Sequence, residues 1–210
     1  SDILTLVMSQ ELKVCIGSSA QPEAVQAGRE AAQRAQEGVP SSRRLALVFG
    51  SSWFHQEHLL NGVRSVLGEI ELIGASTAGE ITPDGPTSHS CVVVLMASDT
   101  VEWGLGMGLE VDRNPRKAGQ RAAFTAAQAL HGRSRVGFLL LGDGLATRYT
   151  EVTRGIQEVL GTRFLIAGGI AGDDLRFSQT YQYWNQQVVS RAVVGVLLGG
   201  SLKMGVGIQH

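Results

Sequence analysis

The sequence predicts an α+β protein of two tandem repeats, in which helices flank mixed β-sheets. Strand-like segments of the first half recur in the second: 45–50 is answered by 136–142, and 91–95 by 192–196. Amphipathic, helix-like segments alternate with the strands, which favours parallel crossovers, whereas closing hairpins would be antiparallel. Glycine is abundant, at 27 of 210 residues, and gathers at strand ends. Because the same segments recur in the same order in both halves, one fold unit is predicted to be present twice.

We expect the first repeat to span 12–102 and the second 103–210, related by a pseudo-twofold axis. Each repeat should follow the order strand, helix, strand, helix, strand, loop and hairpin, a βαβαβ-hairpin unit. Near the end of the sequence, 204–208 repeats the glycine alternation of 103–107, which opens the second repeat. We therefore expect the chain to be a fragment of a longer protein.

Each repeat opens with a strand that leads into a helix with a small-residue face. The strands are 13–17 and 103–108; the helices are 22–36 and 115–130, the second with Asn114 as a good N-cap. The face residues recur at three- and four-residue spacing, so each helix should lie close to a sheet. They are Ala24, Ala27, Gly28, Ala31, Ala32 and Ala35 in the first helix, and Ala118, Gly119, Ala122, Ala123 and Ala126 in the second.

A buried strand, an amphipathic helix and a short strand follow in each repeat. The helices carry an apolar stripe and stop before a glycine, which is a common C-terminal cap. In chain order the segments are 45–50, 59–67 and 71–75 in the first repeat, and 136–142, 149–160 and 163–167 in the second.

A hairpin should close each unit, pairing 90–97 with 101–108 and 188–198 with 202–207. The second repeat also carries an insertion, 178–184, in which polar and aromatic residues alternate as in an extra edge strand. The matching region of the first repeat, 82–86, reads as a plain loop.

Composition excludes some classes of partner. The net charge is −1 and no basic stripe is visible, so nucleic acid is not expected. No apolar run reaches the ~20 residues of a membrane helix, and we expect no membrane insertion. Cys15 and Cys91 lie in apolar strand-like segments, which is no disulfide framework; we expect a reducing, cytoplasmic location.

Candidate site residues lie where strands end, since ligands of open α/β sheets bind beyond the carboxyl ends of strands. The loops 74–80 and 167–174 share a small-small-acid pattern that pairs Glu80 with Asp173, and the turns 50–52 and 142–144 open helices. The candidate ligand-binding residues are Gly50, Ser51, Ser52, Trp53, Ser76, Thr77, Ala78, Gly79, Glu80, Asp143, Gly169, Gly172, Asp173 and Asp174.

The segments 72–81 (LIGASTAGEI) and 166–174 (IAGGIAGDD) resemble the signature of the FIST sensory domain, N-terminal part. The resemblance covers roughly 14–209. It implies a bacterial sensory input domain, found with histidine kinases, cyclases and chemoreceptors. It also implies binding of small ligands, amino acids among them, a C-terminal partner domain, and in some members haem-dependent gas sensing.

We therefore expect a sensory module without catalysis or cofactor, whose ligand is an amino acid or a similar polar metabolite. The ligand's carboxylate would meet backbone N–H groups of the 76–79 loop or of the helix start at Gly50 and Ser51, where the helix dipole favours an anion. Its ammonium would meet Glu80, or Asp173 and Asp174. The partners would be that ligand, a C-terminal domain and an output protein such as a histidine kinase.

Two alternatives belong to other classes. A haem-binding gas sensor, of nitric oxide for example, needs an axial ligand; His55 and His58 share one helix face at i and i+3. An acid-assisted hydrolase would use Asp143, Asp173 and Asp174, because paired carboxylates can share a proton or hold a divalent cation. A dinucleotide loop at 104–108 is not favoured, because its glycines alternate as in a strand.

Overall fold

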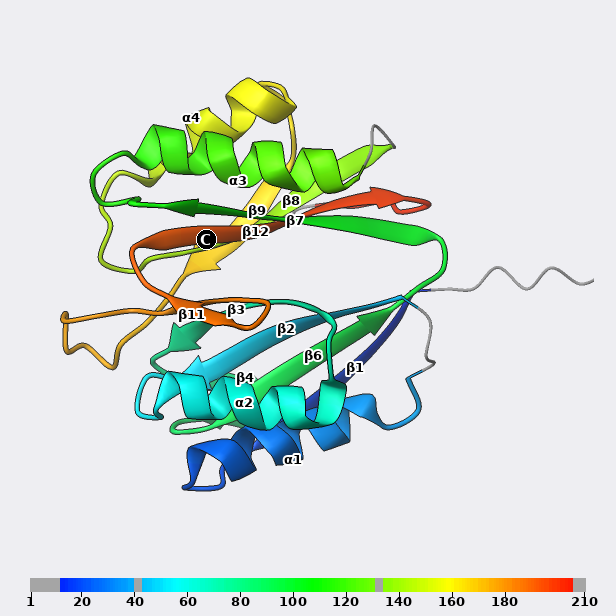
Figure 1. Cartoon of the computed structure of the whole chain (residues 1–210), viewed down its shortest axis with the longest axis vertical. Coiled ribbons are helices and arrows are strands. Elements are labelled where there is room, and N and C mark those ends of the chain that lie inside the picture. Colours follow the sequence, from blue (N-terminus) through cyan, green and yellow to red (C-terminus); the bar gives the residue numbers. More distant parts are fainter. Residues whose placement is uncertain (1–11, 40–42, 131–133, 206–210) are drawn as a thin grey trace, which may run out of the picture.

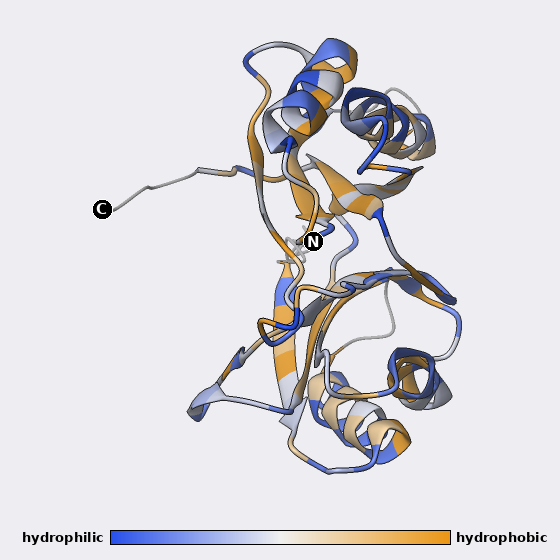
Figure 2. Cartoon of the chain, turned by 90° about the vertical axis from the view of Figure 1, so that its left-hand side faces the viewer, coloured by the Kyte–Doolittle hydropathy of each residue, from blue (hydrophilic) through white to orange (hydrophobic). Residues whose placement is uncertain are grey.

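The computed structural model describes residues 12–39, 43–130 and 134–205. Two sheets pack face to face and a pair of helices covers the outer face of each (Figure 1). Hydrophobic residues concentrate in the strands between the layers, and hydrophilic ones on the outer faces of the helices (Figure 2). The predicted fold class, mixed sheets flanked by helices, is confirmed.

The first sheet has the strand order β1-β6-β2-β3-β10-β11. Only β2 and β3 are parallel, because α2 returns the chain between them; every other pair is antiparallel. Its elements are β1 (Lys13–Ser19), α1 (Ala24–Gln36), β2 (Arg44–Ser51), α2 (Gln56–Leu67), β3 (Glu71–Thr77), β6 (Cys91–Ala97), β10 (Gln182–Trp184) and β11 (Gln187–Val189).

The second sheet has the order β7-β12-β8-β9, which matches β1-β6-β2-β3 strand for strand, with the same parallel and antiparallel pairs. Its elements are β7 (Val101–Leu109), α3 (Pro115–Ala129), β8 (Arg135–Gly142), α4 (Tyr149–Leu160), β9 (Ile166–Ile170) and β12 (Ala192–Gly200). The two halves therefore share one connectivity, and the expected boundary between residues 102 and 103 falls within β7.

The predicted closing hairpins are wrong. β6 lies between β1 and β2, and β7 pairs with β12, so β6 and β7 belong to different sheets. The last strand of each unit inserts between its own first and second strands, a long-range pairing that local alternation cannot reveal. β12 pairs with β7 and β8 rather than with 202–207, of which 202–205 form no strand and the rest lie outside the described residues. The repeated segment 204–208 also runs beyond them.

The insertion forms the predicted strand, β10, but in the sheet of the other half. With β11 it makes a hairpin that pairs with β3 of the first half. The expected plain loop at 82–86 is also wrong, because β4 (Glu80–Thr82) and β5 (Gly85–Thr87) form a hairpin of their own. Each half thus carries a short hairpin before its last strand, and in the part of the chain that the structure describes only the second half's hairpin extends a larger sheet.

The small-residue faces of α1 and α3 are buried, as predicted. α3 lies on β7, where a Cβ at Gly106 would come 2.7 Å from the carbonyl carbon of Ala122. The alternating glycines of 104–108 therefore make room for a helix backbone, and the segment is no dinucleotide loop. One hydrophobic core lies between each sheet and its helices, and a third lies between the two sheets. The fully buried Trp103 is the largest side chain of the third core.

Candidate functional site

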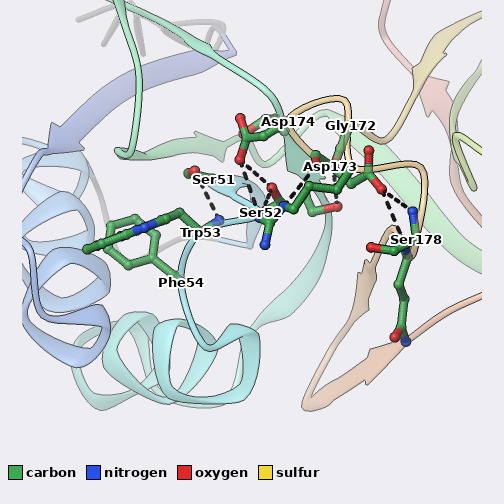
Figure 3. Close-up of polar contacts among 12 residues, drawn as sticks. Ser51, Ser52, Trp53, Phe54, Gly172, Asp173, Asp174 and Ser178 are labelled. Carbon is green, nitrogen blue, oxygen red and sulfur yellow. Dashed lines mark hydrogen bonds and ion pairs between the residues drawn. The ribbon is translucent and has the colours of Figure 1, made fainter.

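The turn that follows β2 is fixed by hydrogen bonds from its backbone N–H groups, one of which stays within the turn (Figure 3). The N–H of Ser51 donates to Ser90 O at 2.9 Å, and that of Ser52 to Thr77 O at 3.0 Å. The N–H of Trp53 donates to the Ser51 hydroxyl at 3.2 Å. These backbone donors are therefore occupied within the protein, although the helix start had been expected to offer them to a ligand.

Ser76, at the end of β3, joins the two candidate loops. Its N–H donates to Tyr181 O at 2.9 Å, its hydroxyl donates to Gly172 O at 2.8 Å and accepts from Tyr181 N at 3.0 Å. Gly172 approaches so closely that a Cβ there would lie 2.7 Å from Ala78 N. The loops after β3 and β9 are thus side by side, but these small residues serve the junction itself.

Glu80 is buried and fully used by its own half. Its carboxylate accepts hydrogen bonds from the Thr77 hydroxyl, from Ser90 N at 3.1 Å and from the Ser90 hydroxyl at 2.7 Å. The carboxylate fixes the β4–β5 hairpin to the start of β6. A buried acid bonded in this way is a structural element rather than a ligand group open to solvent.

The expected pairing of Glu80 with Asp173 is wrong. Gln182 is the counterpart of Glu80: it opens the equivalent hairpin, and its Oε1 accepts from Ala192 N at 3.2 Å, at the start of the last strand. The Nε2 of Gln182 is buried and has no hydrogen-bond partner in the described part of the chain. Ala171 stands where the first half has Thr77, so the equivalent hydroxyl is missing there.

Asp143 stabilises the turn after β8. One carboxylate oxygen accepts from Leu145 N at 2.8 Å and Ala146 N at 3.1 Å, and the other from Arg191 N at 3.0 Å. Asp143 is the counterpart of Ser51: the N–H of Asp143 donates to Ala192 O at 3.0 Å, as the N–H of Ser51 donates to Ser90 O. Asp143 is therefore an intramolecular capping group.

Asp173 organises its own loop. Its carboxylate accepts from Ser178 N at 2.8 Å and Gln179 N at 3.3 Å. Desolvation is the largest single influence and raises its pKa, but the N–H groups of Ser178, Phe177 and Gln179, together with Arg176, bring the pKa of Asp173 below its usual value. Asp143 thus has partners of its own, whereas Arg176 lies beside both Asp173 and Asp174.

The low pKa of Asp173 predicts a contribution to stability that depends on pH. This contribution is present above the unfolded-state pKa of about 3.9 and is lost as the pH falls through the lower folded-state pKa. Asp173→Asn should therefore be less stable than wild type at pH 7, and the difference should shrink below about pH 4. Urea unfolding at pH 7, 5, 4 and 3 checks this. Asp84→Asn, at an exposed turn, is the control; a gap between Asp173→Asn and wild type that is as large at pH 3 as at pH 7 would contradict the assignment.

The second half reaches the first through a polar cluster of three side chains (Figure 3). The Ser52 hydroxyl donates to the Asp174 carboxylate at 2.5 Å, and Arg176 donates to the Ser52 hydroxyl at 2.9 Å. Arg176 and Asp174 also form an ion pair at 3.5 Å. About half of the Arg176 side chain is exposed, so the guanidinium keeps an open side.

Beside this cluster is a pocket of about 470 Å³. It has an aromatic wall, with Trp53 exposed and its ring centroid 5.2 Å from that of His89, the two rings tilted by 30°. The start of α2 faces it, where His55 makes no side-chain cap hydrogen bond. The lining residues are Ser52, Trp53, Phe54, His55, Gln56, Glu57, Arg176, Tyr181 and Val188.

The loop that supplies Asp174 and Arg176 has an unusual backbone. Asp174, Leu175 and Phe177 adopt positive φ angles of 56°, 60° and 50°. Such conformations cost energy in residues other than glycine and collect at ligand clamps and switch regions. The loop is held in this shape by the hydrogen bonds of Asp173 within it and by the bonds of Asp174 and Arg176 to Ser52.

The remaining predicted residues do not converge on this pocket. Thr77, Gly79 and Glu80 line a second pocket of about 310 Å³, Asp143 a third of about 440 Å³, and Gly169 a fourth of about 290 Å³. Of the predicted set, Ser52 and Trp53 line the pocket at the junction, and Asp174 borders it through Arg176. Sequence reasoning missed Arg176, a lone cation just before the insertion.

The haem alternative finds little support in the geometry. His55 and His58 are exposed at the start of α2 and stack on each other, with ring centroids 4.1 Å apart. Haem needs an enclosed pocket whose polarity the protein controls, and these residues do not form one. In the described part of the chain, no three His, Cys, Asp or Glu side chains group to hold a metal ion.

Comparison with known proteins gives one family. The model of the FIST N domain matches residues 44–210. No curated protein matches. Among solved structures, a cyanuric acid hydrolase from A. caulinodans is similar, at 12% identity and a TM-score of 0.45, covering 89% of this chain and 71% of that one. Likeness at this level carries no argument about activity. Within the described residues, no helix is both long and apolar enough to cross a membrane.

Proposed function

The chain belongs to the FIST N domain family of sensory domains, and from this premise we propose that it senses a small polar metabolite with a carboxylate, an amino acid in the first place. The supporting observation is the pocket at the Ser52–Asp174–Arg176 cluster, where groups of both charges border an aromatic wall. Its volume of about 470 Å³ lies within the range of small-molecule sites.

The pocket offers each part of an amino acid a suitable partner. The open side of the Arg176 guanidinium and the positive end of the α2 dipole favour a carboxylate. Glu57 and Asp174 would attract the ammonium, and Trp53 would cover an apolar side chain. This pose differs from the one expected from sequence, because two N–H groups of that pose, those of Ser51 and Ser76, already donate within the protein.

Occupancy of this pocket would couple the two halves. The ligand would contact the turn after β2 and the positive-φ loop after β9, which are joined by the hydrogen bonds of Ser52 with Asp174 and Arg176. A ligand that strengthens these contacts would favour one arrangement of the loop, and a partner domain or an output protein such as a histidine kinase could read it.

The test uses thermal stability of the protein with each of the common amino acids at about 10 mM. A true ligand should raise Tm in a concentration-dependent way, since binding to the folded state alone stabilises by RT ln(1 + [L]/Kd). Two derivatives of the best ligand test its charged groups: the amide lacks the carboxylate, and the N-acetyl derivative lacks the ammonium. Each should lose most of the Tm shift.

Arg176→Gln should abolish the Tm shift, whereas Arg154→Gln, which alters a similarly exposed arginine on α4, should preserve it. If no amino acid stabilises the protein, or if Arg176→Gln responds as wild type, the amino-acid proposal is wrong. A Soret band on haem addition, or turnover of the best ligand, would instead favour one of the two alternative classes.

A further inference from the structure

The protein already shows one case of a hairpin added to a sheet edge. β10 pairs with β3, placing Tyr183 opposite Gly74 and Trp184 opposite Ile73. Tyr183 is fully buried over Gly74, and its hydroxyl donates to the Gln56 side chain at 2.5 Å. A central bulky residue over a glycine anchors this hairpin.

The second sheet has the same edge without the hairpin. Gly168 of β9 pairs with Leu140, as Gly74 of β3 pairs with Val48, so Gly168 is the equivalent of Gly74. Among the described residues, no strand pairs with the outer side of β9. Gly168 is exposed there and opens onto a pocket of about 290 Å³, formed by β9 and α4.

The first half carries a hairpin of matching design, which joins no larger sheet among the described strands. β4 and β5 pair as β10 and β11 do, with two residues between the strands. Glu80 anchors β4 to its own half as Gln182 anchors β10. The residue that corresponds to Tyr183 is then Ile81, whose side chain is 86% exposed.

The open pocket suits an aliphatic anchor better than a tyrosine. In the first half the Tyr183 hydroxyl reaches to Gly50, a Cβ of which would lie 3.0 Å away. In the second half the Tyr149 hydroxyl already fills that place over Gly142, and it donates to Asp143 O at 2.6 Å. The anchor must therefore be shorter, as isoleucine is.

We propose that the β9 edge receives the β4–β5 hairpin of a second copy of this chain. Ile81 would lie opposite Gly168 of the partner, and Thr82 opposite Ala167. Reciprocal exchange would satisfy both edges in a twofold dimer. Pro86, which lacks an N–H, lies on β5, the outer strand of the hairpin, where that donor is not needed. The dimer would also cover Ile81 and Ile16, exposed neighbours that line one pocket.

Sedimentation equilibrium of the whole chain tests this. Wild type should dimerise, and Ile81→Lys should raise the dimer dissociation constant by about 30-fold or more, as loss of an interface hot spot does. Leu175→Lys, at a residue of comparable exposure (79%), should have no effect. Both positions are exposed, so neither change should disturb the fold.

A disulfide trap tests the register. In a Cys15→Ser background, oxidising a mixture of Thr82→Cys and Ala167→Cys chains should link them, because residues directly opposite in adjacent strands have close Cβ atoms. A mixture of Asp84→Cys with Ala167→Cys should not link. A monomer at all concentrations, or a dimer whose dissociation constant does not change with Ile81→Lys, would overturn the proposal.

Discussion

Replacing Gly106 with alanine should destabilise the protein by about 3 kcal/mol or more, at the upper end of what overpacking costs. The added Cβ would lie 2.7 Å from the carbonyl carbon of Ala122 and 3.0 Å from the Cβ of Ala126. Both atoms belong to the inner face of α3. This face consists of backbone and Cβ atoms, so it has no flexible side chain that could move aside. The helix would have to move away from β7 along its length.

The same close approach of α3 recurs at the neighbouring glycines of β7, so a local shift of the helix cannot relieve the clash. A Cβ at Gly108 would come 2.6 Å from the carbonyl carbon of Ala118, and one at Gly104 would come 3.0 Å from the Cβ of Ala129. Gly106→Val should therefore leave no folded protein under ordinary conditions, since total stability is about 5–15 kcal/mol. The evidence would be urea unfolding followed by circular dichroism.

Gly79→Ala is the matched control, because the Cβ there would lie 3.6 Å from its nearest neighbour, Thr87 O, an ordinary contact. It should change stability by no more than about 0.5 kcal/mol, as surface changes do. Equal unfolding midpoints for Gly106→Ala and wild type would mean that α3 does not rest on β7 in this way.

Replacing Tyr183 with alanine should cost about 3–5 kcal/mol, the usual loss for a buried aromatic residue. The ring fills the space over Gly74 and Gly50, and the variant would leave a cavity between β3 and α2. The Gln56 side-chain oxygen, buried as well, would lose its donor. Because β10 pairs with β3 through only three residues, loss of the anchor should also release the hairpin.

Two further variants separate these effects. Tyr183→Phe keeps the ring and removes only the donor, so it should cost about 1–3 kcal/mol. Trp53→Ala removes an exposed aromatic residue and should cost far less. Hydrogen exchange of β3 amides in Tyr183→Phe and Tyr183→Ala would report whether the hairpin stays in place. Similar protection in Tyr183→Ala and wild type would contradict the anchoring role.

Much of the fold was predictable because its signals are local. The small faces of α1 and α3 follow from a three- and four-residue period, and the glycine alternation of β7 follows from a period of two. Strand order was not predictable, because β6 and β12 choose their neighbours from segments far away in the chain. β10 could be recognised as a strand, whereas nothing in three residues says which sheet it enters.

The candidate site was predictable only in part, and for a physical reason. Strand ends did attract polar and small residues, and the loops after β3 and β9 do meet. However, several of the polar side chains accept hydrogen bonds from neighbouring backbone N–H groups, which residue type alone does not reveal. They are those of Ser51, Glu80 and Asp143. The fold of its loop brings Arg176 to the junction pocket, and a single arginine in the sequence carries no signal of this position.

The entry of β10 and β11 into the first sheet has a consequence for the order of events during synthesis. The edge of β3 can be covered only after residues 182–189 have been made, well after the rest of that sheet. Until then a nascent chain exposes an open strand edge and an empty aromatic slot over Gly74, features that favour misassembly. The first half must therefore wait for the second to finish, and the slow step of folding should be the late closure of this long-range pairing.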